Sequence, residues 1–170
     1  YVLIFEKTDV FVVPETGSLP TYADWKRLGG DDGKLVHIFE QAGTQFFTVL
    51  DPDDAIKQQL RREVSRYLRT VQPTWLRLGS VTALHLFQWF QNHRFCGCCG
   101  ARLRKSETER AMVCPECGNV IYPKICPAVI VAICDGDRIV LTRYKDRPVK
   151  HYALVAGFNE IGESIEETVH

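Results

Sequence analysis

Short apolar runs separated by turn residues occupy the first fifty positions of the chain. Residues 2–5 and 10–13 are β-branched and aromatic runs separated by a polar break. Residues 35–39 and 45–50 form a second such pair across Ala42-Gly43-Thr44. Runs of this length, bounded by turn residues, are typical of strands, so the pattern predicts two strand pairs and a β-rich beginning of the chain.

Helical spacing replaces the strand pattern after Leu50. Asp51 and Pro52 are typical of a helix N-terminus, and the apolar residues that follow recur on one face as far as Val71. We expect one helix over residues 51–71 whose basic face is solvated; contact of that face with phosphates is the less favoured alternative. The cations of that face are Lys57, Arg61, Arg62, Arg66 and Arg69. Residues 80–92 are apolar around much of their circumference and predict a second, more deeply buried helix.

Two Cys-x-x-Cys knuckles follow that helix, and each is followed directly by a glycine. The knuckles are Cys96/Cys99 and Cys114/Cys117, with Gly100 and Gly118 behind them. Glycine can adopt the positive φ that such a turn often needs, and four thiolates brought to one point form a closed structural zinc site. A disulfide pair or a redox motif is less favoured, because a redox motif needs no twin and no other feature indicates a secreted domain. Cys98, inside the first knuckle, is expected to point away from the metal.

Strand patterns return after the knuckles. Residues 128–134 form a continuous apolar run, residues 138–143 alternate as its hairpin partner, and residues 152–156 predict a third strand. Ser164 and Glu167 then have the spacing of a capping box, which opens a further helix.

Composition limits the functional classes. The 170 residues carry 21 basic and 21 acidic side chains, so no global field indicates nucleic acid or a membrane surface. No apolar run is long enough for a membrane span, and free cysteines beside a zinc site favour a reducing cytoplasm. We expect Cys126 and Cys134 to be buried strand residues without a metal role. The start at Tyr1 and the end at His170 suggest a fragment.

A family resemblance follows from the second half of the chain. Residues 157–163 (GFNEIGE), between a strand and a capped helix, resemble the first half of the Nudix box, whose Arg and three helical Glu would fall beyond His170. A zinc ribbon lies directly upstream, together with TERAMVC at 108–114, YP at 122–123 and LVAGF at 154–158. With these motifs, the chain resembles the NADH pyrophosphatase family of Nudix hydrolases.

The resemblance implies an α+β architecture in three parts. Residues 1–93 are expected to form a β-rich N-terminal domain with two helices. Residues 94–124 are expected to be the four-cysteine zinc ribbon, and residues 125–170 the first part of a Nudix α/β/α sandwich.

The resemblance also implies an activity. The family hydrolyses the diphosphate of NADH or NAD to a nicotinamide mononucleotide and AMP, and members also remove NAD caps from RNA. Structural Zn²⁺, catalytic Mg²⁺ or Mn²⁺ and a homodimer are implied, and the 170-residue chain itself is expected to be inactive because the box glutamates are missing. Two alternatives remain open: a Nudix hydrolase for another nucleoside diphosphate derivative, and a zinc-ribbon module that binds nucleic acid or protein.

Individual residues take roles from the resemblance. Gly157 is expected to turn the strand sharply, Glu163 to orient the metal-binding helix, and the carbonyl of Ala156 to hold a catalytic divalent ion. Glu160 is as well explained as a solvated loop carboxylate.

Glu109 and Tyr122 resemble the family's dinucleotide contacts. A carboxylate can accept from a ribose hydroxyl or base amine, and a phenol ring can stack on a base. The alternatives are a surface ion pair between Glu109 and Arg110 and a tyrosine that only packs. Both residues flank the second knuckle at five positions, which predicts that they lie on the same side of the ribbon.

Overall fold

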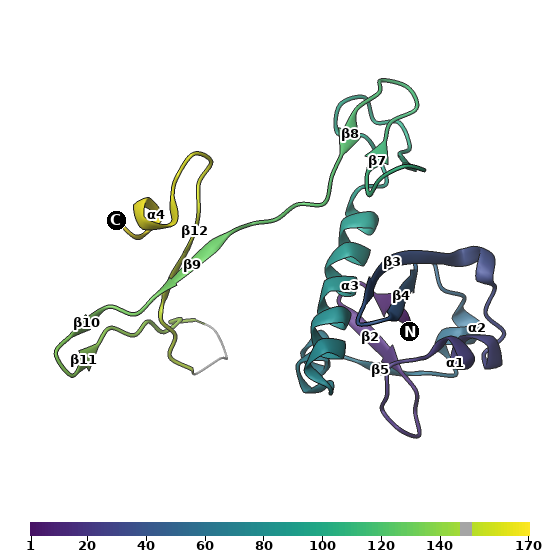
Figure 1. The fold of residues 1–170 in the computed structure, drawn as a ribbon, viewed down its shortest axis with the longest axis horizontal. Coiled ribbons are helices and arrows are strands. Elements are labelled where there is room, and N and C mark those ends of the chain that lie inside the picture. The colour runs from purple at the N-terminus through teal and green to yellow at the C-terminus, as the bar shows by residue number, and fades with distance from the viewer. Residues whose placement is uncertain (147–150) are drawn as a thin grey trace. The chain divides into compact units, whose positions relative to one another are not determined.

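The computed structural model describes residues 1–146 and 151–170, and these form two compact units, Tyr1–Pro123 and Lys124–His170 (Figure 1). The class is mixed α+β, as the sequence predicts. None of the helices in the described ranges is long and apolar enough to cross a membrane.

A five-stranded sheet is the centre of the first unit, with strand order β3-β4-β1-β2-β5. β1 pairs in parallel with β4, and the other neighbours are antiparallel. The two predicted strand pairs are confirmed as β1/β2 and β3/β4. The strands are β1 (Val2–Glu6), β2 (Asp9–Val12), β3 (Leu35–Gln41), β4 (Thr44–Val49) and β5 (Arg61–Glu63).

Both faces of this sheet are covered, because successive residues of a strand point to opposite faces. Leu3 and Phe5 of β1 belong to the core under helix α3 (Thr74–Asn92), where the rings of Phe5 and Phe87 lie 5.3 Å apart. Val2 and Ile4 belong to a second core with Trp25 of α1 (Tyr22–Arg27). α3 lies along one side of the sheet, and α1 and α2 (Asp54–Lys57) lie on the other (Figure 1).

The single helix expected over residues 51–71 is wrong. The chain forms α2, the edge strand β5 and the 3₁₀ helix η2 (Ser65–Thr70) instead. β5 pairs with β2 through Val10 opposite Glu63 and Val12 opposite Arg61, so a strand-edge contact distant in sequence overrides the local helical spacing. Val64, assigned to the buried face of that helix, is exposed. The helix expected over residues 80–92 is confirmed, although it begins earlier, at Thr74.

The ribbon packs on the C-terminal end of α3 within the same unit. Its three-stranded sheet has the order β6-β7-β8 and is formed by β6 (Arg104–Lys105), β7 (Met112–Val113) and β8 (Val120–Ile121). Leu103 and Met112 belong to the same core cluster as Leu86 and Phe90 of α3. The ribbon therefore packs against the C-terminal end of α3 through a shared core.

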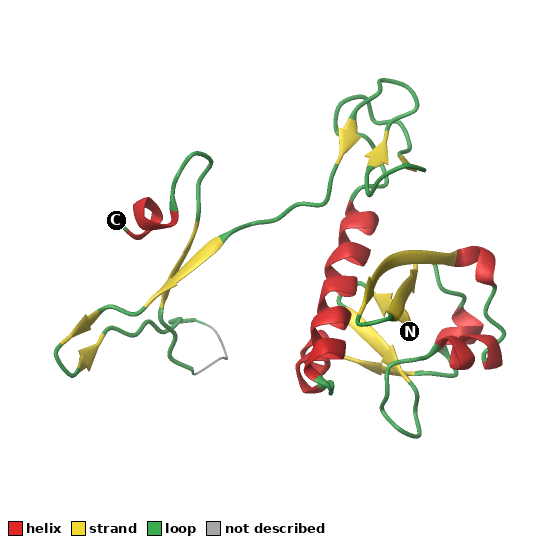
Figure 2. Ribbon diagram, in the orientation of Figure 1, coloured by secondary structure: helices red, strands yellow, loops and turns green. Residues whose placement is uncertain are grey.

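The second unit is a small arrangement of strands with one short helix (Figure 2). β9 (Ala128–Val131) pairs antiparallel with β12 (Val155–Phe158), β10 (Cys134–Asp135) pairs with β11 (Arg138–Ile139), and α4 (Ile165–Val169) follows. The continuous strand expected over residues 128–134 is therefore wrong, because this run divides into β9 and β10. Only β10 forms the expected hairpin with β11, whereas β9 pairs with β12, the displaced form of the third expected strand.

Two cysteine predictions in this unit are wrong. Cys126 and Cys134 are both exposed, and Cys126 lies outside the strands. The physical reason differs between the two. Cys134 lies in the β10–β11 sheet, whose four residues are all exposed, and Cys126 lies in the extended segment before β9.

Candidate functional site

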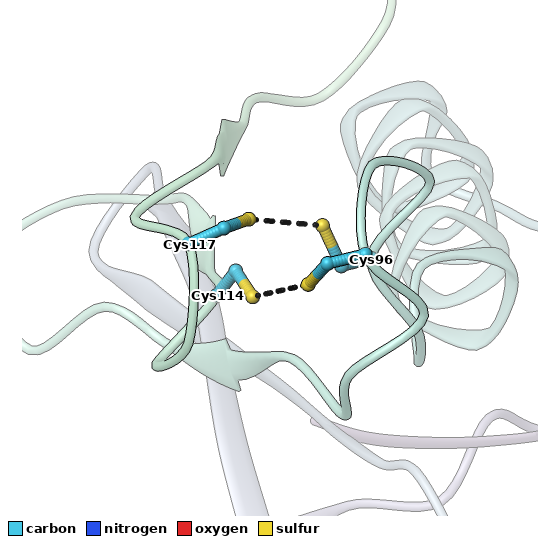
Figure 3. A group of neighbouring side chains, drawn as sticks. Cys96, Cys114 and Cys117 are labelled. Carbon is cyan, nitrogen blue, oxygen red and sulfur yellow. Dashed lines mark hydrogen bonds between the residues drawn. The ribbon is translucent and has the colours of Figure 1, made fainter.

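Four cysteine thiols meet in the ribbon, and their sulfur atoms all lie within 4.8 Å of one another. Cys96 Sγ lies 3.7 Å from Cys117 Sγ, and Cys99 Sγ lies 3.4 Å from Cys114 Sγ (Figure 3). Sulfur atoms around a tetrahedral zinc ion at about 2.3 Å are about 3.8 Å apart. The arrangement therefore has the dimensions of a zinc site with four thiolate ligands.

Both knuckles are built by the same backbone turn. The amide of Gly100 donates to the carbonyl of Cys96 at 2.9 Å, and that of Gly118 donates to Cys114 at 3.1 Å. The two glycines have φ of 77° and 73°, in the left-handed region that favours glycine. The predicted glycine conformation is thus confirmed.

Hydrogen bonds and mutual contact set the pKa values of the thiols. The amides of Cys99 and then Cys98 stabilise the thiolate of Cys96 and lower its pKa to about 6. At Cys117 the amide of Asn119 lowers the pKa, but hydrogen bonds with the neighbouring thiols Cys99 and Cys114 outweigh it and raise the pKa to about 12. The cluster therefore loses a first proton readily and holds its last one strongly.

A bound dication removes that conflict, because it compensates the charge of four adjacent thiolates. The donor set is all sulfur and lies in a closed turn structure, which fits structural Zn²⁺. Cys98 is exposed and lies outside the four-thiol group. Among the residues that the structure describes, this is the only such group of three or more His, Cys, Asp or Glu side chains.

Glu109 and Tyr122 are brought together on the surface of the ribbon. The Tyr122 hydroxyl donates to Glu109 Oε1 at 3.0 Å, which agrees with the predicted placement on one side of the ribbon. That hydrogen bond, and then the charge of the carboxylate, raise the pKa of Tyr122. Tyr122 is 55% exposed, so much of its surface is available to a ligand.

The loop that carries Glu109 is held from two sides. The Ser106 hydroxyl oxygen accepts from the amides of Thr108 and Glu109, each at 3.3 Å. The Arg110 guanidinium donates to the carbonyl of Ile38 in β3 and forms no ion pair with Glu109. The ion-pair alternative for Glu109 is therefore not what the structure contains. A cavity of about 420 Å³ lies between this loop and β3.

The half Nudix box lies in the second unit, and its turn differs from the predicted one. Gly157 is a strand residue of β12 opposite Val129, so it does not turn the chain. The glycine in the left-handed region is Gly162, with φ of 94°. Sequence reasoning missed Gly162 because the family resemblance directed attention to the first glycine of the box.

Glu163 connects this loop to the start of α4. Its Oε2 accepts from the Glu160 amide at 3.2 Å and from the Thr168 hydroxyl at 3.1 Å. Asn159 also donates to the Thr168 hydroxyl oxygen, at 2.6 Å. Ser164 caps the helix in the predicted capping box, with its hydroxyl oxygen accepting from the Glu167 amide. This geometry suits Glu163 as a residue that positions α4.

The carbonyl of Ala156 is free of the β9–β12 pairing. The Asn159 amide donates to the Pro127 carbonyl, which makes these two residues a hydrogen-bonded pair of the antiparallel ladder. Pairs alternate along such a ladder, so Ala156 opposite Ile130 is a non-hydrogen-bonded pair whose carbonyl points away from β9. That oxygen is therefore available as a metal ligand.

Sequence reasoning also missed an apolar cavity of about 730 Å³ beside this loop. Phe158, 72% exposed, lines it with Ile125, Ile161 and Glu163. The sequence could have indicated this cavity, because Phe158 directly follows Gly157 in the half Nudix box. An exposed aromatic ring beside a carboxylate loop can stack on a base.

The ribbon and the chain as a whole are similar to known proteins. Residues 91–122 match the NADH pyrophosphatase zinc ribbon domain. The chain is 34% identical over 142 residues to an NAD-capped RNA hydrolase NudC of Stutzerimonas stutzeri, covering 84% of this chain and 48% of that protein. It is 32% identical over 157 residues to the NudC of Erwinia tasmaniensis, covering 90% and 56%.

A mammalian protein is also similar to the chain. The mouse mitochondrial NAD(P)H pyrophosphatase NUDT13 is 34% identical over 120 residues, which cover 67% of this chain and 34% of that protein. The chain thus spans about half the length, or less, of the curated relatives it matches first.

Proposed function

We propose that this chain, which carries an NADH pyrophosphatase zinc ribbon and is related over most of its length to NAD-capped RNA hydrolases, belongs to an NAD(H) diphosphatase. The reaction is hydrolysis of the diphosphate of NADH or NAD to nicotinamide mononucleotide and AMP, and removal of NAD caps from RNA. The observation that carries the proposal is the Tyr122–Glu109 contact on the matched ribbon.

In the proposed hydrolysis, the residues of the ribbon bind the dinucleotide and Glu163 positions the helix. Water attacks one phosphorus of the diphosphate, its oxygen stays on that phosphate, and the bridging oxygen leaves with the other phosphate. Tyr122 stacks on a base while Glu109 accepts from a ribose hydroxyl or base amine. Glu163 holds the loop against α4 and thereby positions the helix.

A catalytic divalent ion belongs to the proposal, with the Ala156 carbonyl as one ligand. When bound, Mg²⁺ or Mn²⁺ neutralises phosphate oxygens and lowers the pKa of water. Glu160 and Glu163 make no metal group with other described residues, so further carboxylates are required.

The proposal extends to location and assembly. All seven cysteines are free, which agrees with a reducing cytoplasm. A homodimer rests on the family resemblance, and light scattering of the purified protein tests it.

The test is product analysis with the protein that contains this chain. Incubation with NADH and Mg²⁺ or Mn²⁺ in H₂¹⁸O is expected to give AMP and reduced nicotinamide mononucleotide, with one ¹⁸O in one of the two phosphates. Cleavage of other nucleoside diphosphate derivatives with NADH left intact would support the second hydrolase class. Absence of any hydrolysis would leave the ribbon as a binding module.

A further inference from the structure

Three cations of the ribbon have side chains without a partner among the residues that the structure describes. Arg102, Arg104 and Lys105 are exposed, and none of their side chains forms a hydrogen bond or ion pair with the described residues. Leu103 between them is 5% exposed and belongs to the core cluster with Phe90 of α3. The segment 102–105 is therefore anchored by the Leu103 side chain, while its three cationic side chains stay unpaired.

These cations line a cavity of about 310 Å³ beside the end of α3. Arg94 from the C-terminal end of the helix lines the same cavity. Asp51 is the only acid among the lining residues, and it is paired with Arg94 at 2.9 Å. The cavity therefore has an uncompensated positive charge.

Two further cavities share walls with this one. The cavity beside the Glu109 loop shares Phe90 and Lys105 with it. A third, of about 510 Å³, shares Asp51 and Arg94 and adds Lys7, a further cation without a partner among the described residues. The three cavities thus form a track along the C-terminal part of α3, which starts beside the Glu109 loop.

Of the five cations on the predicted basic face, Lys57, Arg61 and Arg62 have acidic partners. Arg61 pairs with Glu63 at 2.9 Å, and Arg62 pairs with Glu6 at 2.7 Å and with Asp9 at 2.8 Å. Acids therefore neutralise these three cations. Arg66 and Arg69 form no ion pair with the described residues, but they line none of the three cavities. Of the two basic regions, only the ribbon track combines unpaired cations with these cavities.

We propose that this track binds the phosphodiester backbone of single-stranded RNA. The inference rests on the proposed function, in which an NAD cap would occupy the contact between Glu109 and Tyr122. The RNA that follows the cap then has its phosphates beside Lys105, Arg104 and Arg102. Proteins usually bind nucleic acids without regard to sequence through exposed arginines and lysines, whose charges attract the regularly spaced phosphates of the backbone.

RNA fits the track better than an acidic peptide does. The end of the track beside Tyr122 carries Glu107 and Glu109. These carboxylates repel both polyanions, but RNA can offset the repulsion because its 2′-hydroxyls donate hydrogen bonds to carboxylates. The ionised side chains of an acidic peptide are acceptors only and cannot do so.

The test is binding of a fluorescent single-stranded RNA of twelve nucleotides to the 170-residue chain, measured by anisotropy at several salt concentrations. The double variant Arg102→Gln/Arg104→Gln is expected to weaken binding roughly tenfold or more and to reduce the slope of log K against log salt by about 1.4. The double variant Arg66→Gln/Arg69→Gln is the matched control, because it removes two exposed cations that line none of these cavities. Circular dichroism and zinc content verify that each variant is folded.

The outcomes separate the track from the hydrolase proposal. Equal weakening by both double variants, unchanged binding by Arg102→Gln/Arg104→Gln, or equally tight binding of a polyglutamate peptide would overturn the track. In the protein that contains this chain, the same variant is expected to lower kcat/KM for NAD-capped RNA about tenfold and to leave NADH hydrolysis unchanged. Failure to hydrolyse NADH would refute the proposed function, while RNA binding by the chain is measured independently.

Discussion

The hydroxyl of Tyr122 donates to Glu109 Oε1 at 3.0 Å, although the two residues are thirteen positions apart and on either side of the second knuckle. The ribbon fold brings them together, with Glu109 in the loop between β6 and β7 and Tyr122 directly after β8. The two side chains therefore act as one unit whose properties can be tested separately from catalysis.

The first prediction concerns the pKa of Tyr122. The hydrogen bond to Glu109, and then the charge of that carboxylate, raise the pKa, so Glu109→Gln is expected to return it toward about 10. The raised pKa favours the neutral phenol, so its contribution to stability is present below the unfolded pKa and is lost as pH rises through the folded pKa. Ultraviolet titration with and without Tyr122→Phe isolates the signal.

Tyr22 provides the control for that titration. Its pKa is raised by a hydrogen bond to Asp32, far from the ribbon. Asp32→Asn is expected to change the pKa of Tyr22 and not that of Tyr122. Glu109→Gln is expected to change the pKa of Tyr122 and not that of Tyr22. A Tyr122 pKa that is insensitive to Glu109→Gln would contradict the contact.

The second prediction concerns substrate binding by the same pair. In the protein that contains this chain, Tyr122→Ala is expected to raise KM for NADH on the order of tenfold through lost stacking, whereas Tyr122→Phe keeps the ring. Glu109→Ala is expected to raise KM to a similar degree through a lost hydrogen bond. Steady-state kinetics with NADH and with a simpler ADP derivative are the measurement. Wild-type constants for both alanine variants would return these residues to surface and packing roles.

The third prediction concerns the metal. We expect one zinc per chain, and its removal by a chelator is expected to unfold the ribbon. Because Cys96, Met112 and Cys114 share a core cluster with Phe90, the end of α3 is expected to lose protection from hydrogen exchange as well. Elemental analysis and exchange measured by mass spectrometry verify both effects.

Two serine variants make the zinc prediction specific. Cys99→Ser removes a member of the four-thiol group and is expected to lower zinc affinity strongly. Cys98→Ser changes an exposed neighbour outside the group and is expected to retain zinc. If Cys98→Ser lowered zinc affinity more than Cys99→Ser did, Cys98 and not Cys99 would be the zinc ligand.

Local patterns in the sequence predict the strand pairs, the long helix and the zinc knuckles, because each of these depends on residues close together along the chain. The expected helix over residues 51–71 fails because β5 is determined by its pairing with β2, about fifty positions away. The contact of Arg110 with the Ile38 carbonyl also joins residues distant in sequence, so no local pattern indicates it. For the same reason the sequence shows cations in the ribbon but not which of them lack acidic partners.

The fourth prediction tests how α3 packs on the sheet. Gly79 is buried, and a Cβ at that position would lie 2.6 Å from a ring carbon of Phe46. Alanine normally stabilises a helix relative to glycine, but here Gly79→Ala is expected to destabilise the fold by about 1–3 kcal/mol through overpacking. Urea denaturation measures the change. Leu78→Ala, at the exposed preceding position, is the control and is expected to have a much smaller effect.

A second substitution distinguishes overpacking from a general defect. Phe46→Leu removes the ring that the new methyl group would meet, so it is expected to make Gly79→Ala less costly in a double-mutant cycle. Additive losses in free energy of unfolding would show that the two positions do not clash.

The fifth prediction concerns the start of α4. The Ser164 hydroxyl oxygen accepts from the Glu167 amide at 3.2 Å, and Glu167 Oε2 accepts from the Ser164 amide at 2.7 Å. Ser164→Ala is expected to destabilise the helix by about 1 kcal/mol, because the Glu167 amide loses its capping partner. Exchange of that amide, followed by NMR, is expected to accelerate, whereas exchange in α3 is expected to stay unchanged.

The pH dependence of the same capping box gives an independent measurement. The Ser164 amide, and then its side chain, lower the pKa of Glu167 below the ordinary 4.5. Because the pKa of Glu167 is lower in the folded state, its stabilisation is fully present above the pKa of the unfolded state. The stabilisation is lost as the pH falls through the pKa of the folded state. Protection of the Ser164 amide is therefore expected to disappear on acidification, and Glu167→Gln is expected to remove most of this pH dependence. Protection that persists below the pKa of Glu167 would show that another group holds the start of α4.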